Sequence, residues 1–240
     1  PLAPTRKNPA NMMAASRSMI VAVTLLLLVV QTSSDFVIGG YLPEYRLYID
    51  MESSLSKLNS LNLFSIEMRH DGSIKSHISD NEIERILSTP AAKNLRPFIT
   101  VGGGGRSGAF SSVVKDGASR RRFVTNLAAF FEKHPFQGVD FDWESPASPS
   151  DMAGYLRLLA ETRSKLGDSV RISVALHAGQ YLADYTVVDH VNLMAYDLRN
   201  SPGVSHSEFH DVTAVVNDYI EKGKCPASKI VVGIPLYGRN

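Results

Sequence analysis

The sequence predicts an α/β protein built around a parallel sheet, and three observations support this fold class. Hydrophobic residues make up 44% of the 240 residues and charged residues 20%, which is the balance of one sizeable globular domain. After Asp35, short apolar runs alternate with amphipathic stretches. The apolar runs have no polar face, as strands covered on both sides require.

Seven of the apolar runs are rich in β-branched residues and are predicted strands. Helix start signals lie between them: Ser79 is followed by Glu82, and Ser148 by Asp151, and both patterns predict capping boxes. Repeated strand-helix units form either an eight-stranded barrel or an open doubly wound sheet, and periodicity alone does not distinguish the two. The predicted strands cover residues 36–41, 61–66, 96–101, 138–143, 170–175, 188–194 and 230–235.

Residues 1–34 are predicted to lie outside the folded domain. Three basic residues precede residues 19–30, which are apolar except for Thr24, a pattern typical of a secretory signal peptide. Such a segment rises only ~18 Å as a helix against ~30 Å of hydrocarbon core, which disfavours an uncleaved anchor. Residues 1–11 precede the first methionine, Met12, and are interpreted as upstream sequence. We expect a secreted protein whose single domain covers residues 35–240.

Charge and cysteine content narrow the classes of partner. The formal net charge is +1, and the one dense basic run, Arg120-Arg121-Arg122, begins a predicted helix, so we interpret it as a solvated face and expect no nucleic-acid partner. Cys225 is the only cysteine, which excludes a disulfide within the chain. We expect a monomer that needs no cofactor.

The strongest chemical signal is a row of three acids, Asp140, Asp142 and Glu144, on an otherwise apolar strand. Their spacing of two projects all three to one face and Val139, Phe141 and Trp143 to the other. Acids at such spacing repel one another and lose hydration, so at least one should hold a proton more readily than a free carboxyl group. Glu144 comes last, at the carboxyl end of the strand, where barrel enzymes have their active sites.

Two other patterns suggest different chemistry and are given less weight. The run from Gly103 to Gly108 satisfies the dinucleotide-binding pattern, but the next strand carries three acids at alternate positions rather than one. His206 and His210 could place two imidazoles on one metal ion. Their order, with Glu208 between them, differs from the usual zinc motif, and no third ligand is evident. We therefore predict no metal site.

Four segments, in order, resemble glycoside hydrolase family 18, the chitinases and their relatives. The resemblance covers the chain from about Asp35 onward and implies a (β/α)₈ barrel whose eighth strand is missing from this chain. In chain order, the segments are Val101-Gly-Gly-Gly-Gly-Arg-Ser107, Gly138-Val-Asp-Phe-Asp-Trp-Glu144, Val191-Asn-Leu-Met-Ala-Tyr-Asp197 and Ile230-Val-Val-Gly-Ile-Pro-Leu-Tyr-Gly-Arg239.

The resemblance also implies a role for each matching residue. It makes Glu144 the proton donor to the glycosidic oxygen, Asp142 the group that orients the substrate's acetamide, and Asp140 the charge partner of Asp142. Tyr196 would donate a hydrogen bond to the acetamide carbonyl, whose oxygen attacks the anomeric carbon in this family. The implied substrate-binding residues are Tyr41, Gly102, Gly103, Trp143, Met194, Asp197, Tyr237 and Arg239.

The chain departs from the family pattern in two places. The family usually has an aspartate one residue before the glycine of the catalytic strand, where this chain has Gln137. An amide cannot share a proton, so we expect a changed pH profile rather than a loss of activity. The family's eighth strand, with a tryptophan that floors the sugar site, is absent here. We therefore expect unpaired edges on the first and seventh strands and a poorly stable chain.

Together these features predict a secreted chitinase that binds chitin or N-acetylglucosamine oligosaccharides and hydrolyses β-1,4 links with retention of configuration. One alternative is a chitin-binding lectin, which the presence of Glu144 disfavours. An inactive fragment is another. A further alternative is an endo-β-N-acetylglucosaminidase acting on N-glycans. No membrane association is expected after signal cleavage.

Overall fold

A sheet of eight strands, seven of them parallel, forms the centre of the computed structural model, which describes residues 36–48, 52–201 and 203–238. The chain divides into two units, residues 1–36 and 37–240, and the sheet belongs to the second. The predicted signal peptide, residues 1–34, lies outside the described residues. Within the described ranges, no helix has the length and apolar character needed to span a membrane.

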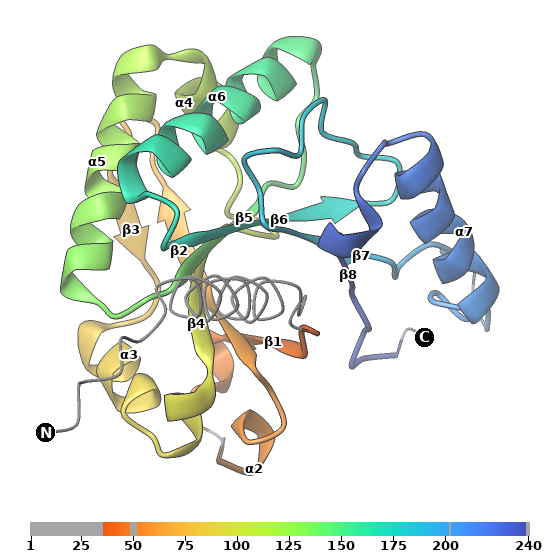
Figure 1. The fold of residues 1–240 in the computed structure, drawn as a ribbon, viewed down its shortest axis with the longest axis horizontal. Coiled ribbons are helices and arrows are strands. Elements are labelled where there is room, and N and C mark those ends of the chain that lie inside the picture. The colour runs from red at the N-terminus through yellow and green to blue at the C-terminus, as the bar shows by residue number, and fades with distance from the viewer. Residues whose placement is uncertain (1–35, 49–51, 202, 239–240) are drawn as a thin grey trace, which may run out of the picture. The chain divides into compact units, whose positions relative to one another are not determined.

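The seven predicted strands are all present, and they pair in chain order. The sheet runs β1-β2-β4-β5-β6-β7-β8, and β3 pairs antiparallel with β2 (Figure 1). Sequence periodicity missed β3 because its Ile-Lys-Ser segment contains no apolar run. The strands are β1 (Gly39–Pro43), β2 (Ser60–Met68), β3 (Ile74–Ser76), β4 (Arg96–Gly102), β5 (Gly138–Asp142), β6 (Arg171–His177), β7 (His190–Met194) and β8 (Ile230–Val232).

Helices follow most of the parallel strands and lie outside the curled sheet (Figure 1). The capping box at Ser79 and Glu82 forms as predicted. At α6 the Ser148 hydroxyl caps the helix, but the Asp151 carboxylate accepts from the backbone N–H of Ala147 instead of that of Ser148. The α-helices are α2 (Glu52–Leu55), α3 (Asp80–Leu87), α4 (Phe110–Lys115), α5 (Gly117–Lys133), α6 (Pro149–Leu166) and α7 (Phe209–Glu221), and 3₁₀ turns occur at Glu44–Arg46, Ala91–Asn94 and Ala227–Lys229.

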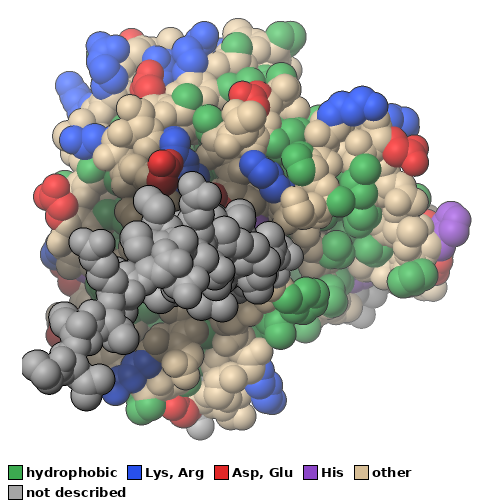
Figure 2. Space-filling model, viewed as in Figure 1, with side chains coloured by type: hydrophobic (Ala, Val, Ile, Leu, Met, Phe, Trp, Pro, Cys, Tyr) green, Lys and Arg blue, Asp and Glu red, His purple; other side chains and the backbone are tan. Residues whose placement is uncertain are grey.

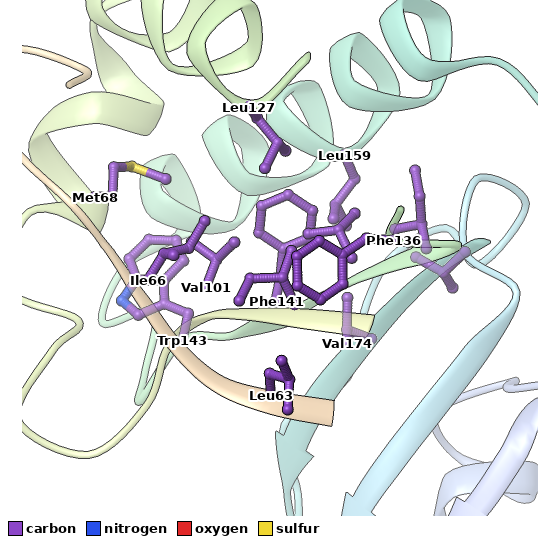
Figure 3. Close-up of a cluster of buried hydrophobic side chains, with 14 of the residues drawn as sticks. Leu63, Ile66, Met68, Val101, Leu127, Phe136, Phe141, Trp143, Leu159 and Val174 are labelled. Atoms are coloured by element: carbon purple, nitrogen blue, oxygen red, sulfur yellow. The ribbon is translucent and has the colours of Figure 1, made fainter. Parts of the chain in front are cut away.

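The main hydrophobic core lies between the outer face of the sheet and helices α4 to α6. Figure 3 shows Leu127 of α5 and Leu159 of α6 over Phe141 of β5. Trp143, directly after β5, stacks on Phe110 with ring centroids 5.1 Å apart. The apolar half of the β5 alternation therefore faces the helices, as its period of two predicts.

The sheet path ends at β1 and β8, and no strand of the described chain pairs with their outer edges. Apolar side chains near β8 are exposed as a result: Val232 is 40%, Ile234 78% and Leu236 99% exposed. Figure 2 shows hydrophobic side chains gathered on this side of the molecule, next to α7.

We expect Phe141→Ala to lower the free energy of unfolding by about 3–5 kcal/mol, because Phe141 is fully buried and its loss leaves a cavity. Phe209→Ala is the matched control, since Phe209 is 87% exposed and its change should stay within about 0.5 kcal/mol. Urea denaturation followed by circular dichroism measures both. Equal effects of the two substitutions would contradict this core.

Candidate active site

The three acids of the β5 segment form a row that runs from the barrel interior to its open end. Asp140 is 0% exposed and Asp142 6%, whereas the Glu144 side chain is 33% exposed. The row follows from strand geometry, because alternate residues share a face. It gives three chemically identical groups three different environments.

Asp140 is fully buried among hydrogen-bond donors from other strands. The Ser173 hydroxyl of β6 donates to Oδ1 at 2.6 Å, and the Asn192 amide of β7 donates to the same oxygen at 2.9 Å. The Tyr41 hydroxyl of β1 donates to Oδ2 at 2.8 Å. Burial raises the pKa of Asp140, while the hydrogen bonds from Ser173, Tyr41 and Asn192 oppose that rise.

Asp142 lies next in the row and has far fewer partners. Its Oδ1 atom is buried and makes no hydrogen bond within the described part of the chain. The sheet register pairs Asp142 with Ala175, whose methyl group offers no donor. Burial, followed by the negative charges of Asp140 and Glu144, raises the pKa of Asp142 from 3.8 to about 8. Asp142 therefore holds a proton at neutral pH.

The end of β4 passes very close to both of its neighbours in the sheet, and two glycines make this possible, Gly102 on the side of β5 and Gly103 on the side of β2. Gly102 has a φ of +95°, and a Cβ atom there would lie 2.4 Å from the backbone oxygen of Asp142. Gly103 has a φ of +94°, and its Cβ would lie 2.1 Å from the Phe64 ring. A Cβ at Gly104 would lie 3.8 Å from both carboxylate oxygens of Glu144, so the loop faces an acid. A carboxyl group at this place disfavours the dinucleotide interpretation, since a loop that binds pyrophosphate presents N–H donors and not an acid.

Ser107, at the end of this glycine loop, holds the turn that carries Glu144. Its hydroxyl accepts from the backbone N–H of Glu144 at 3.2 Å and lies 3.1 Å from the backbone oxygen of Asp142. Ser107 ends the glycine-rich segment that resembles the family, but the sequence indicated no role for it. Ser173 and Asn192 were missed as well, and only their places on neighbouring predicted strands could have indicated them.

Tyrosines from the ends of β7 and β8 flank the row. The rings of Tyr196 and Tyr237 meet edge to face with centroids 6.2 Å apart, and the Tyr237 hydroxyl donates to Asp197 Oδ2 at 2.8 Å. Burial, followed by the charge of Asp142, raises the pKa of Tyr196 well above its ordinary value, so its hydroxyl stays protonated. Met194 ends β7 and is 8% exposed.

His206 ties this tyrosine group together, a role that the sequence did not indicate. Its Nδ1 lies 3.0 Å from Asp197 Oδ1, and its ring stacks on Tyr237 with centroids 5.2 Å apart. The other histidine of the suggested metal pair, His210, has a side chain that is 90% exposed and lies beside Asp211. The two imidazoles therefore have different partners, and no group of metal-binding residues was found in the described ranges.

Three residues singled out by the sequence lie elsewhere. Trp143 is 3% exposed and packs between β5 and the helices, which corrects the expectation that it contacts substrate. Gln137 is exposed and precedes β5, at the opposite end of the strand from Glu144. Seven residues at ~3.3 Å each separate them, so its expected effect on the pH profile has no structural support. Arg239 lies outside the described residues.

Residues 37–240 match the family model described as glycosyl hydrolases family 18. Endochitinase 1 from Metarhizium robertsii is 32% identical over 184 residues, which cover 64% of this chain and 43% of that protein. Chitinase A1 from Niallia circulans is 30% identical over 201 residues, which cover 66% of this chain and 28% of that protein. The chain thus spans less than half the length of either relative.

The fold is also shared with a solved structure. The crystal structure of a chitinase from Rhizomucor miehei superposes with a TM-score of 0.73 and 25% identity, over 84% of this chain and 69% of that one. This match confirms the predicted barrel architecture over an open doubly wound sheet. The described strands form an incomplete barrel of that type.

The raised pKa of Asp142 makes stability depend on pH. The folded state holds this proton up to about pH 8, whereas the unfolded chain releases it near 3.8, so stability falls as pH rises through this window. Asp142→Asn removes the titration. We expect the wild type to lose on the order of 3 kcal/mol relative to this variant between pH 5 and 7.5, at ~1.36 kcal/mol per unit. Urea denaturation at both pH values measures the difference. Parallel losses in the two proteins would count against the assignment.

Proposed function

This chain belongs to glycosyl hydrolase family 18, and from that premise we propose that it hydrolyses β-1,4 links between N-acetylglucosamine units of chitin, with Glu144 as the general acid. One observation carries the proposal: the only partly exposed acid of the row stands last, at the open end of the barrel. A group that donates a proton to substrate needs this access, which the buried Asp140 and Asp142 lack.

Each acid has a role that suits its environment. Glu144 donates its proton to the glycosidic oxygen as the bond to the anomeric carbon breaks. Asp142 orients the acetamide group, and when its carboxyl group loses its proton the carboxylate offsets the positive charge that develops there. Asp140, held by donors from three strands, is a fixed charge partner behind it. Environments that differ along one row allow such different roles for the same functional group.

The nucleophile in this mechanism is the acetamide oxygen of the substrate, which attacks the anomeric carbon and forms an oxazolinium ion. Intramolecular attack gains effective molarity, because the reacting atoms are already held together. The Tyr196 hydroxyl, which stays protonated, donates to the acetamide oxygen and orients it. Water then attacks the anomeric carbon, the Glu144 carboxylate accepts the proton of that water, and the configuration is retained.

The substrate class rests on the relatives, which carry the names endochitinase and chitinase. A lectin that binds chitin without cutting it shares this fold, but the presence and accessibility of Glu144 favour catalysis. An endo-acting enzyme on N-glycans uses the same acetamide chemistry. Tyr41, Met194, Asp197, Tyr237 and the glycine loop line the proposed sugar site.

We expect Glu144→Gln to lower kcat on N-acetylglucosamine oligomers by about 10² to 10⁴-fold, because the amide has no acidic proton. Binding of the oligomers, followed by calorimetry, should persist. Glu132→Gln, on the exposed face of α5, is the matched control and should leave kcat unchanged.

Other outcomes of this assay separate the alternatives. A wild type that binds oligomers without cutting them is a lectin. Cleavage of a high-mannose glycoprotein without cleavage of chitin oligomers indicates the N-glycan enzyme. Release of the α-anomer as the first product, detected by NMR, excludes the retaining mechanism.

We propose that residues 12–34 direct secretion and are then removed. Expression of the whole chain in a secreting eukaryotic host should release a protein whose amino terminus, read by mass spectrometry, lies near Asp35. Replacing Leu26 and Leu27 with aspartate should keep the protein inside the cell, because it interrupts the apolar segment. Secretion of that variant at the wild-type level would contradict the proposal.

A further inference from the structure

The inner face of β6 matches the acid row residue by residue. The sheet register pairs Asp140 with Ser173 and Asp142 with Ala175. Two residues beyond this last pair on each strand, the same alternation brings Glu144 level with His177. The contact is present: His177 Nε2 lies 3.9 Å from Glu144 Oε2.

The three β6 residues differ in what they offer their neighbours. Ser173 offers a hydrogen bond, which Asp140 accepts at 2.6 Å. Ala175 offers none, and Asp142 is the acid that keeps its proton. His177 offers an imidazole, the side chain whose charge most readily changes between pH 5 and 8. Of the three β6 residues, only His177 is ionisable, and it lies beside Glu144, the acid with access to substrate.

The backbone of His177 is fixed from the helical side of the barrel. The Tyr219 hydroxyl of α7, fully buried, donates to the His177 carbonyl oxygen at 2.6 Å. The Gln180 backbone N–H donates to the same oxygen at 3.0 Å, and the Gln180 side-chain oxygen accepts from the His177 N–H at 3.2 Å. The side chain itself is 47% exposed. The imidazole is thus held at the barrel opening without being part of the core.

We propose that His177 is a positioning residue for Glu144, one that favours the ionised carboxylate during the second half of the reaction. This inference rests on the proposed function. Glu144 must carry a proton when the glycosidic bond breaks and must be ionised to accept a proton from the attacking water. A cation about 4 Å away favours the ionised form. Glu144 becomes ionised when it gives its proton to the glycosidic oxygen, and His177 stabilises that carboxylate and keeps it oriented.

Two other titratable groups near Glu144 hold their protons at neutral pH and oppose its ionisation only when they lose them. Asp142 on β5 and the Tyr196 hydroxyl beyond β7 both interact electrostatically with Glu144, and a negative charge on either disfavours a second one. The His177 imidazole, from β6, supplies the opposing positive charge in its protonated form. On the helical side, the Tyr219 hydroxyl of α7 is bound to the backbone oxygens of His177 and Gln180.

Two substitutions with opposite expected effects test this inference. His177→Gln removes the cation, so Glu144 keeps its proton to higher pH and the descending limb of the kcat/KM profile moves up by about 0.5 pH unit or more. His177→Lys keeps a positive charge throughout the range, and the same limb moves to lower pH. His210→Gln, at an exposed position on α7, is the matched control and leaves the profile unchanged.

The profiles are measured on an N-acetylglucosamine oligomer between pH 4 and 9, with circular dichroism to verify folding. Both substitutions are at a half-exposed side chain and leave no cavity, so both variants should fold. The pH profile of each variant is compared separately with that of the wild type. If the wild type cuts the oligomer and all profiles coincide, His177 has no such role while the proposed function stands. Shifts of both variants in the same direction would also overturn the inference. A wild type without hydrolytic activity overturns the proposed function and this inference together.

Discussion

Strand β5 has to satisfy opposite demands on its two faces, and the remaining elements are arranged around them. Phe141 and Trp143 on the outer side need an apolar cover, which is supplied by the helices that follow β4 and β5. The acids on the inner side need donors, because burying an unpartnered carboxylate is costly. A curled parallel sheet meets both demands, since it separates an apolar outer layer from a polar interior lined by several strands.

The polar interior is graded along the strand, and this gradient gives the acids their different chemistry. Deep in the barrel, Asp140 accepts bonds from β1, β6 and β7. One level higher, Asp142 loses hydration without gaining donors and keeps its proton. At the opening, Glu144 regains contact with solvent. Burial decreases and accessibility increases along β5, and the donors from β1, β6 and β7 further distinguish Asp140 from the other two acids.

The loops at this end of the barrel fix the positions of side chains that lie beyond the ends of the strands. Gly102 lets the end of β4 approach β5, Gly103 leaves room for the Phe64 ring of β2, and Ser107 then holds the turn at Glu144. His206 joins the ends of β7 and β8 through its contacts with Asp197 and Tyr237. These contacts are local hydrogen bonds and ring stacking, and they set the positions of the side chains that face the proposed sugar site.

The sequence by itself determined the order of the strands, the two faces of β5 and the acid row, because these depend on periodicity and on neighbours two or three residues away. It also indicated the helix caps, with one difference at Ser148. Tertiary structure alone decided which groups meet the acids: Ser173 lies 33 residues from Asp140, and Tyr41 lies 99. Such contacts depend on sheet register and barrel curvature, which periodicity does not encode. For the same reason, only the structure shows that His177 lies beside Glu144, whereas the core position of Trp143 follows from the alternation along β5.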